Sequence, residues 1–404
     1  MKNYFLCLLF LAALFFTGCE NSVNGSFPDD ATISFTTFNA RMTDELPLRA
    51  KRFKKMKPLF AEVTSDIFCI QDLYGNDVLE KTREMLRDEY GFDFQLYAKT
   101  SNKDEDLEYT EGQTIPPACT MNDLAPVLSC VLTECPDYQP MCLIQNCGPD
   151  FLELPADCRN CMLSQGFEAI QNGNYLEVLE ACQQSERIPA KRLEYEYSGN
   201  NGILLVSKLP MKNKSSVKLR SYGKLRTALS VVVEKPKLGN IQVICTSLSP
   251  LSDEEYNGFG ESWKDEQLTQ VEQLLSIPVE ENVNQRVILG DLNSNFPLGE
   301  DIPDFNTDPV GIFQLNGWYD PYFKLYDTEE SEASEFCTVC EENPFVSGTN
   351  SVPDHILFQT KKGYTFESYR SLYNLFTELD YDAHTKTSYS VSDHYGITTV
   401  MSLK

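Results

Sequence analysis

Histidine is scarce in this chain. Among 404 residues there are only three, His355, His384 and His394. Imidazole is the side chain whose ordinary pKa suits proton transfer near neutral pH. Any histidine-based acid–base chemistry is therefore confined to these three positions.

Positive charge is also in short supply. Lys and Arg number 34 against 60 Asp and Glu, which gives a formal net charge of −26. Such a surface repels polyanions, so extended non-specific nucleic-acid binding is disfavoured unless a local basic face or a metal reverses the field. Basic residues concentrate in 49–57, interpreted as the solvated face of a helix, and in 208–226, which carries seven Lys or Arg and no acid. The second segment is either a solvated loop or a rim that meets a phosphate-bearing substrate.

Long apolar runs are absent beyond the N-terminus, as are internal repeats and low-complexity tracts. The leader MKNYFLCLLFLAALFFTGC has a short basic start, an apolar run and small residues before Cys19. The run is short for a membrane span and stands where a signal peptide stands. We therefore expect residues 1–18 to be a signal peptide and the protein to be exported.

The end of the leader, FTGC, resembles a bacterial lipobox, although Phe16 stands where an aliphatic residue is usual. The resemblance implies that Cys19 is lipidated and that residues 19–30 form a flexible tether. The expected location is then the bacterial cell envelope, at the outer membrane or cell surface. Simple secretion without a lipid is the alternative.

Cysteine, in contrast, is plentiful, with fourteen residues, of which eight fall within 119–182. An even number in an exported chain predicts a disulfide framework, here of four bridges, whose connectivity the sequence does not give. A metal site would need CxxC pairs at finger-like spacing, and only CRNC at 158–161 has the inner spacing. The second CxxC, Cys337 and Cys340, predicts another loop staple.

A hydrophobic content of 42% is typical of a globular protein. Short β-rich runs, mostly continuously apolar, are typical of strands covered on both faces. They lie at 33–40, 66–74, 202–208, 227–234, 241–248, 286–293, 355–360 and 396–403. Amphipathic stretches at 46–63 and 263–275 predict helices between them, which indicates a layered α/β fold. Cys69 and Cys245 lie in two of the apolar runs and are interpreted as free buried thiols.

Residues 112–190 interrupt this alternation and contain the cysteine block. We interpret them as a disulfide-rich insertion within a single domain that spans 31–404.

Polar residues end several of the predicted strands. Any one of them is readily explained as a cap or turn. Together they are carboxylates, carboxamides and a histidine, which are the groups that open layered sheets gather at one edge. These residues are Asn39, Asp72, Asp291, Asn293, Asp354, Asp393 and His394.

The order of these segments and their amino-acid sequences resemble those of the endonuclease/exonuclease/phosphatase superfamily. This superfamily includes deoxyribonucleases, abasic-site endonucleases, inositol-polyphosphate phosphatases and sphingomyelinases. FTTFNA is similar to its opening strand, ILGDLN to its most specific motif and SDHYG to its C-terminal signature. The resemblance covers roughly 32–404 apart from the cysteine-rich insertion. It implies a four-layer α/β sandwich of two packed mixed β-sheets with outer helices.

The resemblance also implies metal-dependent hydrolysis of phosphoester bonds. Asp72, supported by Asn39 and Asp393, would hold a divalent ion, and oxygen ligands favour Mg²⁺, or Mn²⁺ or Ca²⁺, over zinc. His394 would be the general base, with Asp354 accepting from its other ring nitrogen.

Four further residues complete the implied site. Asp291 and Asn293 would position the attacking water and a phosphate oxygen, while Arg226 and Ser247 would face the substrate. The expected partners are a phosphoester substrate (a small molecule, a lipid head group or nucleic acid) and the membrane through the lipid anchor. No protein partner is evident.

Two positions depart from the family pattern. The pair Gln71-Asp72 usually ends in Glu, and Ser247 stands where deoxyribonuclease- and sphingomyelinase-like members carry a second catalytic histidine. Serine cannot act as an acid near neutral pH, and loss of a general acid typically costs about 10²–10⁴-fold in rate. His384 is interpreted as a loop histidine. The competing hypothesis is a non-catalytic or weakly active envelope lipoprotein that binds a partner through its insertion.

Overall fold

The structure is a computed structural model. It describes residues 31–43, 46, 48–98, 117, 119–135, 146–147, 149–151, 153–155, 158, 162, 182–183, 195–252, 256, 262–297, 308–322, 333–346, 350–360, 363–372, 375–379 and 386–404. Within these ranges, none of the helices has the length and apolar character that crossing a bilayer requires. The predicted signal peptide, Cys19 and the whole of the predicted tether lie outside the described residues.

The first sheet has six strands in the order β10-β13-β1-β2-β4-β3. Only β1 and β2 run parallel, and every other neighbouring pair is antiparallel. The strands are β1 (Thr32–Asn39), β2 (Ile67–Gln71), β3 (Phe94–Tyr97), β4 (Leu204–Ser207), β10 (Tyr364–Ser371) and β13 (Gly396–Leu403).

The second sheet has five strands in sequence order, and here β7 and β8 are the parallel pair. Its strands are β5 (Met211–Leu219), β6 (Arg226–Lys235), β7 (Gly239–Ser247), β8 (Val283–Pro297) and β9 (Ser351–Thr360). A separate hairpin pairs β11 (Leu375–Leu379) with β12 (Lys386–Ser390).

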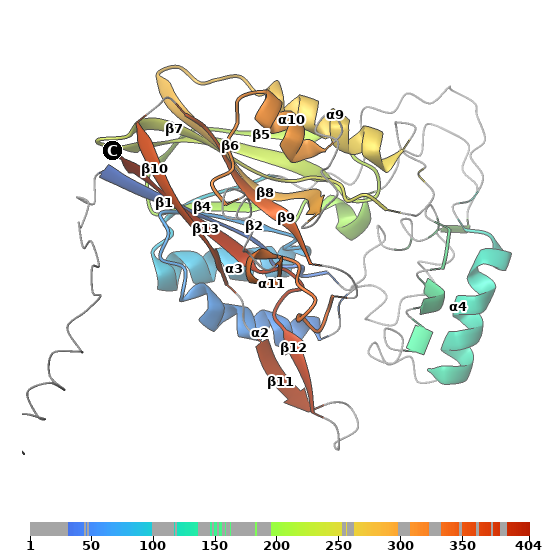
Figure 1. Ribbon diagram of the computed structural model, residues 1–404. Helices are drawn as coiled ribbons and strands as arrows, with labels where there is room; N and C mark the ends of the chain where they lie inside the picture. Colours follow the sequence, from blue (N-terminus) through green and yellow to red (C-terminus); the bar gives the residue numbers. More distant parts are fainter. Residues whose placement is uncertain are drawn as a thin grey trace, which may run out of the picture.

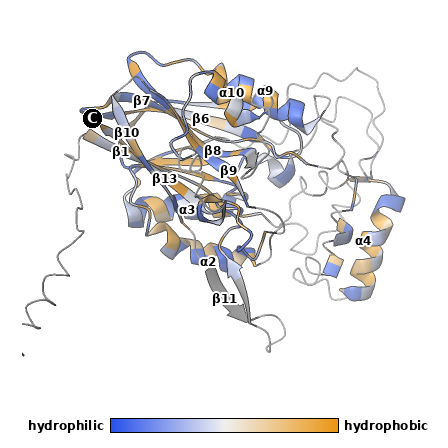
Figure 2. Cartoon of the chain, in the orientation of Figure 1, coloured by the Kyte–Doolittle hydropathy of each residue, from blue (hydrophilic) through white to orange (hydrophobic). Residues whose placement is uncertain are grey.

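Helices cover the outer face of each sheet (Figure 1). On the first sheet, α2 (Arg49–Phe60) and α3 (Asn76–Tyr90) bury one apolar cluster. On the second sheet, α9 (Trp263–Leu275) and α10 (Pro309–Leu315) bury another. A third cluster fills the space between the two sheets, and its apolar strands are visible as the hydrophobic interior in Figure 2. The predicted four-layer α/β sandwich is therefore confirmed.

The interior between the sheets corrects one prediction. Cys69 on β2 and Cys245 on β7 form a disulfide, so they are not free thiols. The two residues lie 176 positions apart, and each was interpreted only from its own apolar strand. Because the strands belong to different sheets, the bridge ties the two sheets together covalently.

Gly290, in the ILGDLN motif, allows β7 and β8 to approach each other closely. A Cβ atom at this position would lie 1.8 Å from the carbonyl oxygen of Thr246, which no side chain tolerates. The glycine therefore sets the parallel pairing that brings Ser247 opposite Asp291.

Helix caps fix α9 and α10 over the end of β8. Ser262 accepts a hydrogen bond from the backbone N–H of Asp265 at the start of α9, and Asp308 caps α10 in the same way. Gln267 of α9 donates to the carbonyl oxygen of Asn293, and Ser294 donates to Asp308. The strand end that carries Asp291 and Asn293 is thus held from the helix side.

The cysteine-rich segment has a small core of its own around α4 (Met121–Glu134). Two bridges are Cys119–Cys158 and Cys130–Cys147, which supports the predicted disulfide framework. Cys158 of the CRNC segment is paired with Cys119 and is therefore not a thiolate metal ligand. The predicted limits of the insertion, 112 and 190, lie outside the described residues.

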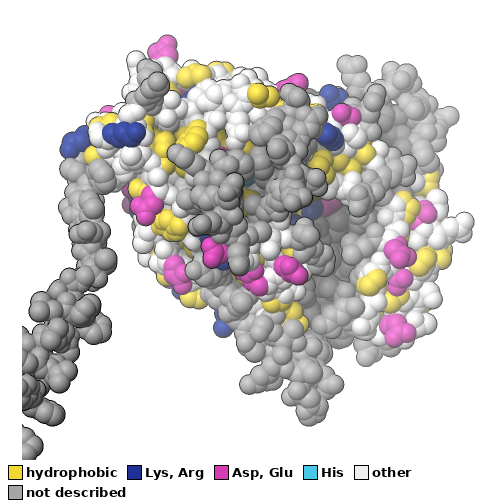
Figure 3. All heavy atoms as spheres, in the orientation of Figure 1, with side chains coloured by type: hydrophobic (Ala, Val, Ile, Leu, Met, Phe, Trp, Pro, Cys, Tyr) yellow, Lys and Arg dark blue, Asp and Glu magenta, His cyan; other side chains and the backbone are white. Residues whose placement is uncertain are grey.

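The basic segment 49–57 follows the expected pattern with one exception. Its lysines are exposed along α2, but Arg52 is fully buried and donates to the carbonyl oxygens of Arg41, Thr43 and Val391. Elsewhere on the visible face, acidic side chains are scattered rather than gathered in one patch (Figure 3).

Candidate active site

Asn39, the last residue of β1, connects the two sheets. Its Nδ2 donates to Oδ2 of Asp291 at 2.8 Å and lies 3.3 Å from Oδ2 of Asp72, while its Oδ1 accepts from the backbone N–H of Arg41. In this structure Asn39 therefore presents its amide nitrogen, and not its oxygen, to the two carboxylates.

Asp72 follows β2 directly and adopts a left-handed backbone with φ of +55°. The peptide is held there by Gly202, whose carbonyl oxygen accepts from the N–H of Leu73. A side chain on Gly202 would meet Cα of Asp72 at 3.2 Å. The Gly-rich entry to β4 thus fixes the position of this carboxylate.

Arg226 begins β6, and its buried guanidinium points into the same site. Its Nη1 donates to Oγ of Ser247 at 2.6 Å and lies 3.6 Å from Oδ1 of Asp72. Burial opposes the charge on Arg226, but the neighbouring Tyr74 and Asp72 raise its pKa above the ordinary value. The guanidinium therefore stays protonated and is placed to attract an anion.

Asp291 and Asn293 lie together on β8. The backbone N–H of Asn293 donates to Oδ1 of Asp291 at 2.9 Å. The Asn293 side-chain amide instead donates to the carbonyl oxygen of Leu248. Burial, together with the nearby charges of Asp354 and Asp72, raises the pKa of Asp291 to about 6, although the charge of His394 acts in the opposite direction.

His394 precedes β13 and pairs with Asp354 of β9. Its Nδ1 lies 2.8 Å from Oδ2 of Asp354, and both side chains are buried. Burial works against the imidazolium, but the charges of Asp354 and Asp393 raise the pKa of His394 to about 10. The predicted base is thus oriented by the predicted acceptor, and the surrounding carboxylates favour its protonated form.

Asp393 lies beside His394, with its Oδ1 3.9 Å from Nε2 of the imidazole. Its Oδ2 lies 3.8 Å from Nη1 of Arg41. Burial alone would raise the pKa of Asp393, but the positive charges of Arg41 and His394 lower it below the ordinary value. This carboxylate is therefore ionised.

The other two histidines are separate from this group. His355 lies on the opposite face of β9, where its Nδ1 is 2.7 Å from Oδ2 of Asp320. Adjacent strand residues point to opposite faces, which explains why Asp354 and His355 have different partners. His384 lies outside the described residues.

The buried carboxylates are suited to a divalent cation. Asp72 Oδ1 is buried and has no hydrogen-bond donor among the described residues. Asp72 and Asp291 share the donor Asn39 and both have oxygen ligands to offer. The Arg226 guanidinium, 3.6 Å from that oxygen, offsets part of its charge without a hydrogen bond, and a divalent cation between Asp72 and the second carboxylate, Asp291, would offset the rest.

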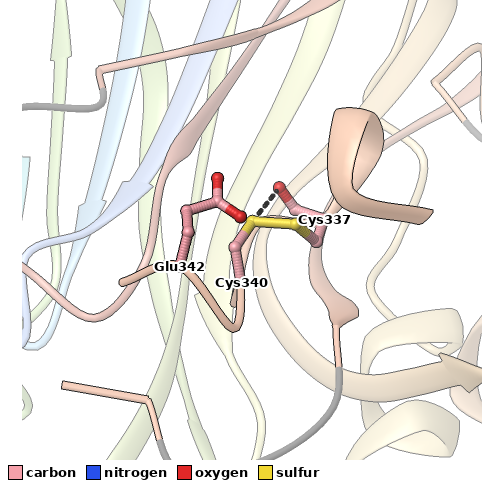
Figure 4. Close-up of side chains that lie close together, drawn as sticks. All are labelled: Cys337, Cys340 and Glu342. Carbon is pink, nitrogen blue, oxygen red and sulfur yellow. Dashed lines mark hydrogen bonds between the residues drawn. A yellow bond between two sulfur atoms is a disulfide. The ribbon is translucent and has the colours of Figure 1, made fainter. Parts of the chain in front are cut away.

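A second group of ligating side chains is not a metal centre in this state. Cys337, Cys340 and Glu342 have atoms within 4.8 Å of one another (Figure 4). The two sulfurs, however, form a disulfide, so neither is a thiolate. The predicted loop staple is confirmed, and Nη1 of Arg370, 3.2 Å from Sγ of Cys340, adds a positive charge that disfavours a cation.

Two contacts of the site escaped the sequence reasoning. Thr338 donates to Asp354 at 2.7 Å, and Arg41 faces Asp393. Thr338 lies inside the CTVC segment, which was interpreted only as a staple, and Arg41 lies two residues after the strand end at Asn39. Neither residue type carries a signal that would distinguish it from an ordinary loop residue.

Comparison with known proteins supports the fold and goes no further. Neither a protein-family model nor a curated protein matches the sequence. Among solved structures, an endonuclease/exonuclease/phosphatase from Beutenbergia cavernae matches with a TM-score of 0.50 and 13% identity, covering 92% of this chain and 72% of that one. SmcL matches with a TM-score of 0.51 and 11% identity, covering 91% of this chain and 98% of its own.

A mutant beta toxin from Staphylococcus aureus with bound magnesium ions matches with a TM-score of 0.50 and 14% identity, over 92% of this chain and 99% of that one. Identities this low establish similarity of fold alone. The chain therefore has the α/β sandwich fold of the endonuclease/exonuclease/phosphatase proteins.

Proposed function

We propose that this protein is an exported, metal-dependent hydrolase of phosphoester bonds. The observation that carries the proposal is one buried network to which both sheets contribute. Asn39 bonds to Asp72 and Asp291 across the sheets, and Asp72 pairs with the cation Arg226. Ser392 links the carbonyl oxygen of Asn39 to the backbone N–H of His394, whose ring is oriented by Asp354. Metal-assisted hydrolysis of a phosphoester can use all three kinds of group: a fixed positive charge, carboxylates that hold a metal ion, and a base.

Asp72 would hold the metal, with Asn39 and Asp393 in support, and Mg²⁺ fits this oxygen-rich set best. Oδ1 of Asn39 now accepts a hydrogen bond from the backbone N–H of Arg41. Asn39 would have to give up this hydrogen bond in order to ligate the metal through the same oxygen. When bound, the ion would polarise the phosphoryl group and offset its negative charge.

His394 would accept the proton of the attacking water at Nε2, because Asp354 engages Nδ1. Its raised pKa arises from nearby negative charge, so compensation of that charge by a cation would lower it toward the range where the imidazole is free to accept a proton. The attacking oxygen would form the new bond to phosphorus as the ester bond to the leaving oxygen breaks.

Arg226 would stabilise the phosphoryl oxygens, and Ser247 holds its guanidinium by accepting a hydrogen bond. Neither residue protonates a leaving oxygen near neutral pH. The proposed enzyme therefore favours substrates whose leaving group departs as an anion or is protonated by solvent.

The proposed location is the cell envelope, with a lipid on Cys19 anchoring the protein after removal of residues 1–18. The lipobox-like FTGC supports this part of the proposal. Acidic composition makes a small phosphoester or a lipid head group a better match than long duplex nucleic acid.

The test is hydrolysis of a chromogenic phosphodiester, a chromogenic phosphomonoester and plasmid DNA with Mg²⁺ or Mn²⁺. We expect turnover that EDTA abolishes and that His394→Asn lowers strongly. His355→Asn is a matched control, because it removes the other buried histidine that pairs with an aspartate. It should alter stability but leave the rate per folded molecule nearly unchanged.

Absence of turnover with either metal, together with absence of metal-induced heat stabilisation, would refute the proposal. That result would favour the competing hypothesis, a non-catalytic lipoprotein that binds a partner through its cysteine-rich insertion. Equal loss of rate in the two histidine variants would refute the role of His394.

A further inference from the structure

The loop 337–343 docks on both segments that carry the histidine–aspartate pair. Toward β9, the backbone N–H of Thr338 donates to the carbonyl oxygen of Ser351, and Val339 exchanges hydrogen bonds with the same residue. Toward β13, the N–H of Tyr395 donates to the carbonyl oxygen of Thr338 at 2.7 Å. Backbone bonds therefore hold Thr338 against both the strand that carries Asp354 and the segment that carries His394.

The side chain of Thr338 reaches the carboxylate directly. Its Oγ1 donates to Oδ2 of Asp354 at 2.7 Å, and the same oxygen lies 2.8 Å from Nδ1 of His394. Thr338 and Asp354 are fully buried, so water does not readily replace this donor. Because Thr338 and His394 both contact Oδ2, the carboxylate group of Asp354 has one favoured orientation.

The disulfide closes a ring around this threonine. Cys337 and Cys340 flank the segment, and both are fully buried. Nη1 of Arg370 on β10 donates to the carbonyl oxygen of Cys337 at 3.2 Å and lies near both sulfurs. At the far end, Asn343 donates to the carbonyl oxygen of Ser392, two residues before His394.

We propose that Thr338, held in the ring that the Cys337–Cys340 disulfide closes, is the positioning residue that keeps Asp354 turned toward His394. The inference deepens the proposed function, on which its kinetic consequence rests. The ring fixes a rotation of the carboxylate that the strand alone does not specify. Its loss should therefore impair the chemical step more than substrate binding.

The test compares Thr338→Val, which is close in shape, with Thr338→Ser, which keeps the hydroxyl. We expect kcat to fall about 10–100-fold in the valine variant, as for loss of a hydrogen bond to a charged group, with KM changed by less than about twofold. The serine variant should recover most of the rate. Cys337→Ser/Cys340→Ser should show the same kcat loss as the valine variant.

Two controls separate positioning from general damage to the fold. Thr36→Val removes another buried threonine hydroxyl, which bonds to Thr398 at 2.9 Å on the outer face of the first sheet. Cys130→Ser/Cys147→Ser removes a bridge in the insertion. Both should leave kcat unchanged.

A second measurement does not depend on turnover. The protein has only three histidines, so the Nδ1–H proton of His394 can be assigned by proton NMR of the labelled protein with histidine variants. It should give a downfield, exchange-protected signal that broadens in Thr338→Val and in the double serine variant.

If the valine variant keeps both kcat and this signal, or loses kcat while the signal is unchanged, the proposal is overturned. A sharp signal in the double serine variant overturns the role of the disulfide. If no variant turns over any substrate, the signal alone decides the positioning role.

Discussion

Arg226 donates from Nη1 to Oγ of Ser247 over 2.6 Å and faces Oδ1 of Asp72 at 3.6 Å. The serine, which replaces a histidine expected from the family resemblance, thus serves as an acceptor for the guanidinium. In the proposed site this position would support the Arg226 guanidinium rather than supply a proton.

The first prediction follows from this pair. Arg226→Lys should lower kcat/KM about 10²–10³-fold, as for loss of a preorganised donor to the transition state. Ser247→Ala should cost about tenfold or less, because Arg226 keeps its attraction to Asp72. Steady-state kinetics on a chromogenic phosphodiester measures both, and equal losses would show that Ser247 acts on the substrate itself.

The second prediction concerns pH in the absence of metal. His394 has its pKa raised from 6.5 to about 10, so it should stay protonated at neutral pH and lose its proton only in alkaline solution. Its contribution to stability is then complete below pH 6.5 and is lost as the pH rises through about 10. NMR titration of the ring protons and melting curves over the same range measure the two effects.

A matched pair of variants checks the cause of that shift. Asp354→Asn should lower the pKa of His394 clearly, because it removes the nearest negative charge. Asp320→Asn should lower the pKa of His355 instead, because Asp320 is the partner of that ring. If the pKa of His394 does not change in Asp354→Asn, the attribution to this pair is wrong.

The third prediction concerns the metal. Mg²⁺ at about 100 times its dissociation constant should stabilise the protein by about 2.7 kcal/mol, since it binds the folded state. Asp72→Asn should abolish this gain, whereas Asp320→Asn, a buried carboxylate elsewhere, should retain it. Thermal melts with and without Mg²⁺ provide the measurement. Undiminished stabilisation of Asp72→Asn would move the metal site to other ligands.

The fourth prediction concerns the bridge between the sheets. Cys69→Ala/Cys245→Ala should lower the free energy of unfolding by about 2–5 kcal/mol, because the bridge closes a long loop of 176 residues in the unfolded chain. Urea unfolding of the purified variant measures this loss. An unchanged midpoint and slope would show that packing of the two sheets alone sets the stability.

Several elements were predictable because their local pattern and their burial agree. Continuous apolar runs identified the central strands β1, β2, β7 and β8, all of which are covered on both faces. The edge strands β5 and β10 were missed, because β5 is mostly exposed and β10 alternates between half-buried and exposed residues. Helix α3 was missed too, although its buried residues Val78, Leu79, Thr82 and Leu86 recur at helical spacing.

The sequence by itself determined which strands are buried, which polar side chains end them, and that the cysteines of the insertion and of the CTVC segment form bridges. Only the tertiary structure decided the long-range partners, because each of these pairs joins segments that local pattern does not relate. Asn39 and Asp291 lie 252 residues apart, and Cys69 and Cys245 lie 176 apart. The packing of one sheet on the other turns strand-end polar residues into a site, and it also places Thr338 against Asp354.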